Sequence, residues 1–151
     1  MVQSLLELCS RTFVRKNKIN LDEINLFFEK NAFVDVNQID SNGKNSLMIL
    51  CENQNENLEI FKFLLEKGIN INQINNSGLT LISYVRKMET IKFLIENGLD
   101  FSLLNYDGET FLETLNSIHD VIKYVEQGVN INVLNSDNET IFDKYYEHNY
   151  A

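Results

Sequence analysis

The sequence predicts an all-α protein that repeats one unit made of a turn and two helices. Near copies of one segment stand at 62–68 (KFLLEKG), 92–98 (KFLIENG) and 123–128 (KYVEQG). A second set of near copies, each rich in Asn, Asp and Gly, begins at 40, 75, 105 and 135. Both sets recur at intervals close to 30 residues, and a fixed period of this length is typical of repeat architectures.

Each unit opens with a tight turn and a short helix. The turn position is occupied by Gly43, Gly78, Gly108 and Asn138, residue types that tolerate the positive φ of many turns. Two residues later stand Asn45, Thr80, Thr110 and Thr140, which we expect to cap the helix that follows. The predicted short helices are Leu47–Cys51, Ile82–Val85 and Leu112–Leu115.

A longer amphipathic helix follows in each unit. Apolar residues recur at offsets 0, 3, 6 and 7, which indicates one buried helical face. The four sets are Leu21, Ile24, Phe27, Phe28; Leu58, Phe61, Leu64, Leu65; Met88, Ile91, Leu94, Ile95; and Ile118, Val121, Tyr124, Val125. Gly68, Gly98 and Gly128 are expected to end three of these helices in a left-handed conformation, and Asn31 is expected to do so in the first unit.

The units resemble those of the ankyrin repeat family, which open with Asp-x-x-Gly-x-Thr-Pro-Leu-His and close with Leu-Leu-x-x-Gly-Ala-Asp-Val-Asn. Matches include Asp40, Gly43 and Leu47 in the opening motif and 64–72, 94–102 and 125–132 in the closing motif. The resemblance implies an ankyrin-type helix-turn-helix solenoid with β-turn fingers, in one domain spanning 1–151. Its units would be 1–37, 38–72, 73–102, 103–132 and a partial unit 133–151, and the outer faces of the terminal units should be polar.

The sequence departs from the family pattern in three places. Proline is absent, and its position is filled by Ser46, Leu81, Phe111 and Ile141. The histidine position is filled by Met48, Ser83, Glu113 and Asp143, so the usual histidine hydrogen bonds to the turn should be missing. Two units have 30 residues instead of the family's usual 33 and are shortened between their helices, whereas the 35-residue unit has a longer polar loop at 52–59.

The charge of the chain argues against binding to nucleic acid or to an anionic membrane, and its two cysteines do not indicate a disulfide framework. The formal net charge is −9, and residues 101–151 contain nine acidic and two basic side chains. Such a chain is poorly suited to nucleic acid or to an anionic membrane, because both require clustered Lys and Arg. No signal peptide or membrane-spanning run is visible, so a cytoplasmic location is expected. Cys9 and Cys51 are expected to be reduced and buried.

The sequence shows no catalytic motif. No nucleophile elbow, P-loop or His-Glu-x-x-His segment occurs, and His119 and His148 have no neighbours at ligand spacing. We therefore expect no enzymatic activity, no metal and no cofactor.

The resulting functional hypothesis is a monomeric module that binds a folded protein through its fingers and the concave face of its short helices. The candidate partner-binding residues are Ser41, Asn42, Lys44, Asn76, Ser77, Leu79, Tyr106, Asp107, Glu109, Glu113, Asp137, Glu139 and Asp143. Their carboxylates would form either a docking strip for a basic partner or a merely solubilising face. An alternative is a stand-alone immunity or inhibitor protein that blocks a basic enzyme such as a nuclease toxin, and an exported effector is a further possibility.

Overall fold

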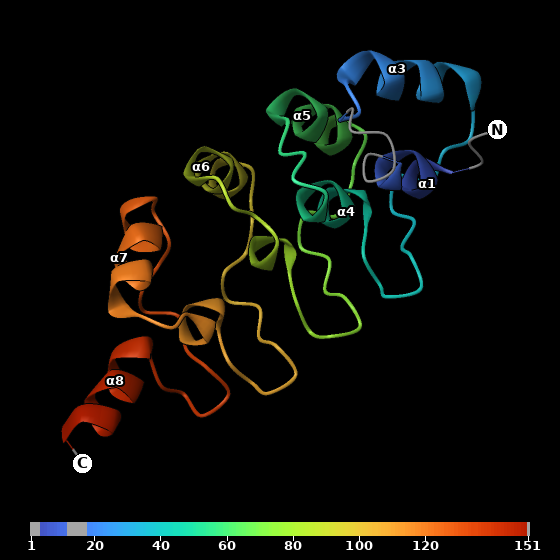
Figure 1. The fold of residues 1–151 in the computed structure, drawn as a ribbon. Helices are drawn as coiled ribbons and strands as arrows, with labels where there is room; N and C mark the ends of the chain where they lie inside the picture. Colours follow the sequence, from blue (N-terminus) through green and yellow to red (C-terminus); the bar gives the residue numbers. More distant parts are fainter. Residues whose placement is uncertain (1–3, 12–17, 151) are drawn as a thin grey trace.

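The helices of this protein are stacked in two rows. A computed structural model describes residues 4–11 and 18–150, with the side chains of 148–150 excluded. Residues 1–3 and 12–17 of the predicted first unit, and residue 151 of the last, lie outside this description, as does the side chain of His148. In Figure 1, α3, α5, α6 and α7 form one row, the short helices and α8 form the other, and the turns project as fingers beyond the short helices.

The helices follow the predicted order. The first unit contains α1 (Leu5–Ser10) and α3 (Leu21–Lys30), and the second contains α4 (Ser46–Glu52) and α5 (Leu58–Glu66). The next two units contain the 3₁₀ helix η1 (Leu81–Ser83) with α6 (Met88–Glu96), and the 3₁₀ helix η2 (Phe111–Thr114) with α7 (Ile118–Glu126). The last helix is α8 (Ile141–Tyr150). No strand occurs in the described residues, so the all-α fold class is confirmed.

The short helices differ between units of different length. In the 35-residue unit α4 is a full α-helix, whereas η1 and η2 of the 30-residue units are 3₁₀ turns that begin one residue before the predicted helices. A 3₁₀ turn rises about 2.0 Å per residue, more than an α-helix does.

The buried face of the second helices is rotated from the predicted one. Phe61, Leu64, Ile91, Leu94 and Val121 are fully buried as expected. Met88 and Ile118, however, are 37% and 43% exposed, so their assignment to the core was wrong. Residues at offset 2, such as Ile60 and Thr90, are fully buried. The face is therefore centred on offsets 2, 3 and 6, which leaves offset 0 more than a quarter of a turn away from its centre.

The predicted helix ends are right in three units and wrong in one. Gly68, Gly98 and Gly128 have φ values of 88°, 92° and 100°, in the left-handed region that glycine adopts most readily. Asn31 instead has φ of −123° and ψ of 97°, which is extended. Its side-chain amide donates a hydrogen bond of 2.7 Å to the carbonyl of Phe27, so it satisfies a free carbonyl at the end of α3 without turning left-handed.

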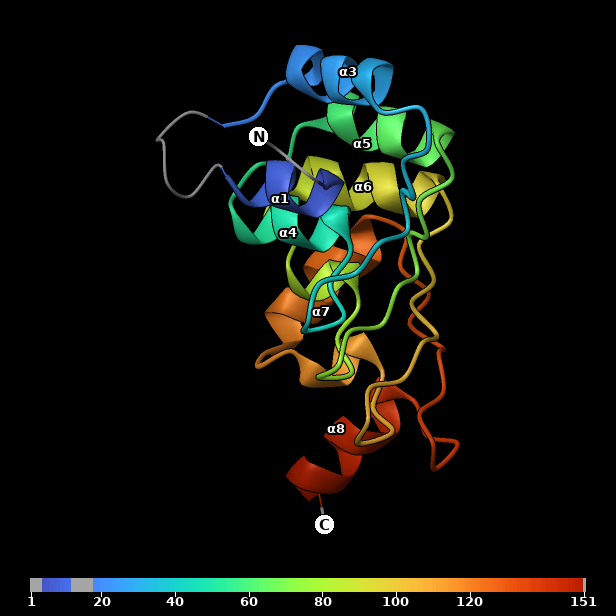
Figure 2. The same cartoon turned by 90° about the vertical axis from the view of Figure 1, so that its right-hand side faces the viewer.

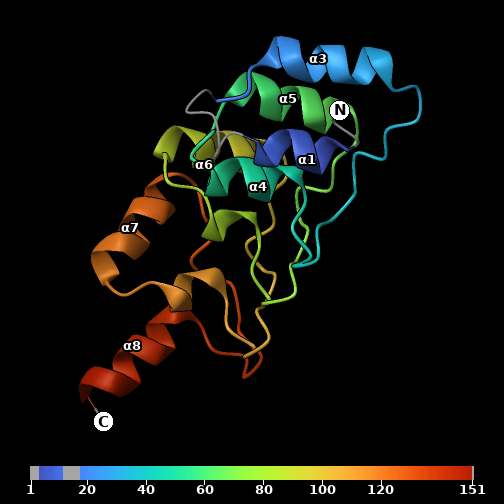
Figure 3. The ribbon, with the colours of Figure 1, turned by 45° about the vertical axis from the view of Figure 1, so that its right-hand side comes forward.

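The core is thick at the N-terminal end and thin at the C-terminal end. A large cluster joins α1, α3, α4, α5, η1 and α6 and includes Cys9 and Cys51, which are both fully buried and not bonded to each other in a disulfide. A second, much smaller cluster consists of Leu112, Val121, Val129 and Ile141. Figures 2 and 3 show the corresponding arrangement, with α8 at the far end of the stack. We therefore expect the last units to be the least stable part of the solenoid.

Candidate partner-binding surface

One residue at the base of each finger organises its backbone. Asn75 Oδ1 accepts hydrogen bonds from the backbone N–H groups of Ser77 (2.9 Å) and Leu79 (3.0 Å). The Oδ1 atoms of Asp40, Asn105 and Asn135 accept the same pair of hydrogen bonds in their own fingers. Asx side chains commonly stabilise turns in this way. The recurring Asp or Asn in the sequence thus gives all four fingers the same shape.

Adjacent fingers contact each other closely. The backbone N–H of Asn76 donates to the carbonyl of Asn42, and that of Ser136 donates to the carbonyl of Gly108, both at 2.9 Å. Between the middle two fingers, Tyr106 lies against Gly78, where an added Cβ would come within 2.8 Å of the Tyr106 nitrogen. The turn glycines are therefore required both for a positive φ and for this close approach. The fingers form one continuous row, visible edge-on in Figure 2.

The structure divides the predicted contact residues into two groups. The exposed group lies on the fingers and at the start of α8 and contains Ser41, Asn42, Asn76, Ser77, Tyr106, Asp107, Asp137 and Asp143. The half-buried group contains Lys44, Leu79, Glu109, Glu113 and Glu139. Tyr106 is 72% exposed even though its hydroxyl donates a 3.2 Å hydrogen bond to the carbonyl of Asn75. It therefore presents most of an aromatic ring from a fixed position.

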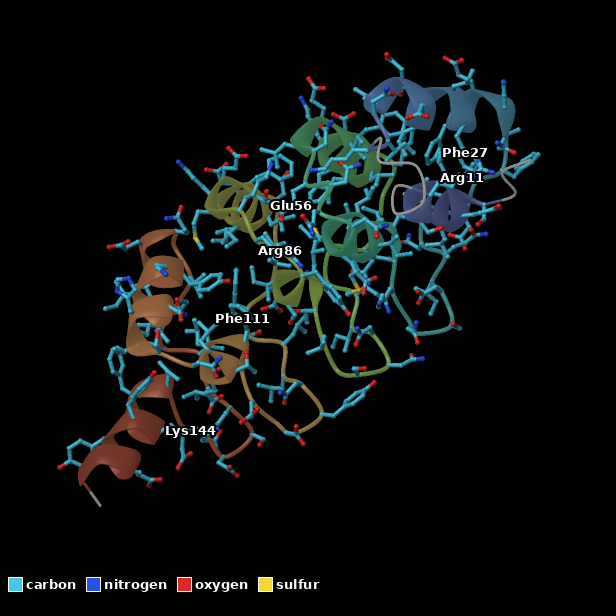
Figure 4. The ribbon with its side chains drawn as sticks, in the orientation of Figure 1. Arg11, Phe27, Glu56, Arg86, Phe111 and Lys144 are labelled. Atoms are coloured by element: carbon cyan, nitrogen blue, oxygen red, sulfur yellow. The ribbon has the colours of Figure 1, made fainter. Side chains whose placement is uncertain are left out.

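Two of the predicted acidic residues are engaged within the protein. Lys144 of α8 places its Nζ atom 3.0 Å from Glu109 Oε1 and 3.3 Å from Glu113 Oε1. The side chain of Glu113 is completely buried and also accepts hydrogen bonds from the backbone and hydroxyl of Thr110 and from the amide of Asn135. Figure 4 shows Lys144 on the side of α8 that faces η2, where Phe111 lies. Sequence reasoning missed Lys144, whose partners are 31 and 35 residues away.

These contacts keep all three groups charged. The hydrogen bond from Lys144, followed by that from Asn105, lowers the pKa of Glu109. Burial by itself would raise the pKa of Glu113, but the hydrogen bonds from Thr110, Asn135 and Lys144 outweigh it and lower this pKa. The hydrogen bond to Glu109 is the main cause of the raised pKa of Lys144. The cluster therefore ties α8 to the preceding unit and offers little free charge to a partner.

The caps of the short helices are partly as predicted. Asn45 accepts from the backbone N–H of Met48, and Thr140 accepts from that of Asp143 at 3.4 Å. Thr110 bonds to the Glu113 carboxylate, but the Thr80 side chain makes no capping bond at η1. In the last two units, Glu113 and Asp143 replace the family's histidine as partners of the preceding threonine. Carboxylates thus provide hydrogen bonds at the position where the histidine hydrogen bonds were expected to be missing.

The first finger also has an internal ion pair. Lys44 Nζ is 2.7 Å from Glu52 Oε1 and 5.6 Å from the centre of the Tyr84 ring. The hydrogen bond to Glu52 raises the pKa of Lys44. Like Glu109, Lys44 contacts a residue of the following unit, in this case Tyr84. The side chains that remain free to make new contacts are therefore chiefly those at the fingertips.

A small pocket lies between the third and fourth units on the finger side of η1 and η2. Its apolar lining includes Leu79, Leu103 and Phe111, and its polar lining includes Glu109 and Thr114. No sequence motif indicated Leu103 as a lining residue, because its neighbours across the pocket come from a different unit. Gly78 of the second finger and Asn105 at the base of the third also line it.

Comparison with protein families supports the resemblance drawn from the motifs. Residues 42–76 match the family model of the ankyrin repeat. This segment is thus similar to an ankyrin repeat. It runs from the first finger through α4 and α5 to the second finger, and it is the unit in which the first helix is a full α-helix. Ankyrin repeats are generally protein–protein interaction modules, and the family is typically non-catalytic. No curated protein matches the sequence.

Two kinds of feature are absent from the part of the chain that the structure describes. No group of three or more His, Cys, Asp or Glu side chains in these residues could hold a metal ion. Within the same residues, no helix combines the length and apolar character needed to cross a bilayer.

Proposed function

We propose that the single domain 1–151 binds a folded protein partner through its ankyrin-repeat fingers and the concave face of its short helices. The observation that supports this proposal most directly is the row of fingertips, held together by backbone hydrogen bonds between neighbouring fingers. Along this row Asn42, Asn76, Tyr106 and Asp137 are exposed. A surface that is already ordered loses little conformational entropy on binding.

Tyr106 is the proposed anchor of this surface. Its ring is 72% exposed and is held by its hydroxyl and by its contact with Gly78. Tyrosine is enriched among the residues that dominate binding energy at protein interfaces. Removing this ring should therefore weaken binding more than truncating the neighbouring polar fingertips.

The charge of the fingertips favours a basic partner. Asp107 and Asp137 are exposed at the tips of the last two fingers, and residues 101–151 contain nine acidic against two basic side chains. This observation also favours the second candidate function, an inhibitor that blocks a basic enzyme. For that candidate, complementary charge should accelerate association and make it sensitive to salt.

The proposal is tested by capturing a partner from cell extract with the native protein and then measuring its affinity for two doubly substituted variants. Asp107→Lys/Asp137→Lys reverses charge at the fingertips, whereas Glu66→Lys/Glu96→Lys makes the same charge change at exposed positions of α5 and α6. We expect the fingertip variant to lose binding and the helix variant to retain it. Equal binding by both variants would contradict the proposed site.

The inhibitor candidate needs its own measurement. The purified partner is assayed for enzymatic activity with and without the native protein, and the dissociation constant is measured at low and high salt. We expect inhibition and a dissociation constant that rises with salt. A partner that keeps full activity in the complex, or an affinity insensitive to salt, would rule this candidate out.

A further inference from the structure

The last helix exposes two aromatic residues, one of them at a position that is buried in three earlier units. Phe142 occupies the place of Leu47, Ile82 and Leu112 in the repeat. The side chains at those three positions are 0%, 2% and 2% exposed, whereas Phe142 is 53% exposed. One turn later, Tyr146 is 68% exposed where α4 has the fully buried Cys51. The outer face of this helix therefore carries two aromatic side chains beside the exposed Asp143 and Glu147, whereas a wholly polar face was expected.

The helix α8 is the last element of the described residues, at one end of the stack (Figure 1). The helix α7 has a polar residue at one position that is buried in α5 and α6. Asp120 stands where Ile60 and Thr90 are fully buried, and it bonds to Ser117 and Lys123. This position of α7 is therefore polar, although Ile118 and Ile122 of the same helix are 43% and 48% exposed.

The charges beside this stripe are negative. Asp143 and Glu147 are exposed on the same helix. The one cation of α8, Lys144, is drawn to Glu109 and Glu113 and so adds no free positive charge to the outer face. Two copies of this end would bring together two segments that each contain nine acidic and two basic side chains, so their pairing is opposed by charge. The charges fit an occupant that is both apolar and basic.

We propose that the outer face of α8, defined by Phe142, Asp143, Tyr146 and Glu147, docks an amphipathic basic helix of a protein partner. Phe142 and Tyr146 are four residues apart, so their rings lie on one side of the helix and can receive apolar side chains of a facing helix. Asp143 and Glu147 would pair with Lys or Arg at the edge of the contact. The inference rests on the proposed function, to which it adds a second contact surface beyond the fingers.

The test titrates the ¹⁵N-labelled protein with a synthetic helical peptide of Leu and Arg in amphipathic order. A peptide with Glu in place of Arg serves as the charge control. We expect saturable amide shift changes centred on α8 with the basic peptide and none with the acidic one. Shift changes centred on the fingers, or equal binding of both peptides, would overturn the inference.

Substitution separates apolar docking from simple attraction of a basic peptide. Phe142→Ser/Tyr146→Ser changes no charge and should weaken binding of the Leu–Arg peptide about tenfold or more, as expected for loss of two aromatic anchors. Ile122→Ser is the matched control, since Ile122 is 48% exposed on α7 outside the proposed face. Equal affinity of the aromatic double variant and the native protein would overturn the inference.

Two further results separate the inference from its alternatives. Sedimentation at increasing concentration should show a monomer, whereas a dimer abolished by Phe142→Ser/Tyr146→Ser would assign the face to a second copy and overturn the proposal. The fingertip variant Asp107→Lys/Asp137→Lys should still bind the peptide on α8. If fingertip charge reversal abolishes capture of the partner while the peptide leaves α8 unperturbed, the proposed function stands and this inference fails.

Discussion

The Glu56 carboxylate accepts a 2.8 Å hydrogen bond from the backbone N–H of Arg86, which lies 30 residues further along the chain. Its second oxygen accepts from the N–H of Lys87 at 3.1 Å. Glu56 belongs to the long loop of the 35-residue unit, and Arg86 and Lys87 belong to the shortened loop of the next unit. Figure 4 labels Glu56 and Arg86 between the two rows of helices. The long loop thus supplies the partner for backbone groups of the short one.

Replacing Glu56 should destabilise the fold. Its side chain is almost fully buried, with 6% of the residue exposed. Glu56→Gln removes the charge that strengthens both hydrogen bonds and should lower the free energy of unfolding by about 2 kcal/mol. Urea unfolding followed by circular dichroism measures the change. The control Glu59→Gln, at an exposed position of α5, should change stability by less than about 0.5 kcal/mol; equal effects of the two substitutions would contradict the role of Glu56.

Substituting alanine at two glycines should separate backbone conformation from close packing. Gly78 and Gly98 have φ values of 74° and 92°, so Ala at either position should cost about 1–2 kcal/mol. At Gly78 the new Cβ would also lie 2.8 Å from the Tyr106 nitrogen, whereas at Gly98 it would meet nothing within 4 Å. Gly78→Ala should therefore destabilise the protein by a further 1–3 kcal/mol, approximately, in thermal or urea unfolding. Equal losses of unfolding free energy in the two variants would contradict a close contact between Gly78 and Tyr106.

The cluster around Glu113 should make stability depend on pH. Glu113→Gln removes an acceptor of hydrogen bonds from Thr110, Asn135 and Lys144, which should cost about 2 kcal/mol at pH 7. The pKa of Glu113 is lowered in the folded protein from its ordinary value of 4.5. Its stabilising contribution is therefore complete above pH 4.5 and is lost as the pH falls through the folded pKa.

The measurement compares urea unfolding of the native protein and the Glu113→Gln variant at pH 7 and in strong acid. We expect the difference in unfolding free energy to shrink below the ordinary pKa of 4.5. At the alkaline end, the raised pKa of Lys144 has the opposite sign, and its contribution is lost as the pH rises through that pKa. A difference that stays constant into strong acid would show that charge on Glu113 is unimportant.

The two cysteines should react slowly in the native protein. Burial raises the pKa of the Cys9 thiol to about 12 and raises that of Cys51 as well. Thiol reagents attack the thiolate, so both low access and low ionisation oppose the reaction. Labelling with a chromogenic disulfide at pH 8 should report both thiols in denaturant and almost none without it. Rapid labelling of the native protein would contradict the burial of α1 against α4.

The sequence predicted the local features of the fold well. The period, the turn residues Gly43 and Gly78 and the left-handed helix ends at Gly68 and Gly98 are all confirmed. These features depend on residues within one turn of the chain, and few residue types tolerate a positive φ. The failure at Asn31 has a local cause as well, because an asparagine can satisfy a free carbonyl with its side chain and then has no need of that conformation.

The candidate site was predicted in part. The sequence identified which residues lie on the fingers, because the Asp or Asn at the start of each turn determines its shape. It could not show that Lys144 would form ion pairs with Glu109 and Glu113, or that Tyr106 would pack against Gly78. These contacts join different units, and no spacing within one unit encodes them.

The sequence by itself determined the repeat, the all-α class, the finger positions and the acidic character of the C-terminal third. Only the tertiary structure decided which carboxylates are free, which apolar residues are exposed and how the long and short loops meet through Glu56 and Arg86. The physical reason is that backbone conformation depends on neighbours in the chain, whereas burial and ion pairing depend on neighbours in space. In a solenoid these come from the adjacent unit, about 30 residues away, and at α8 such a neighbour is missing from the described chain.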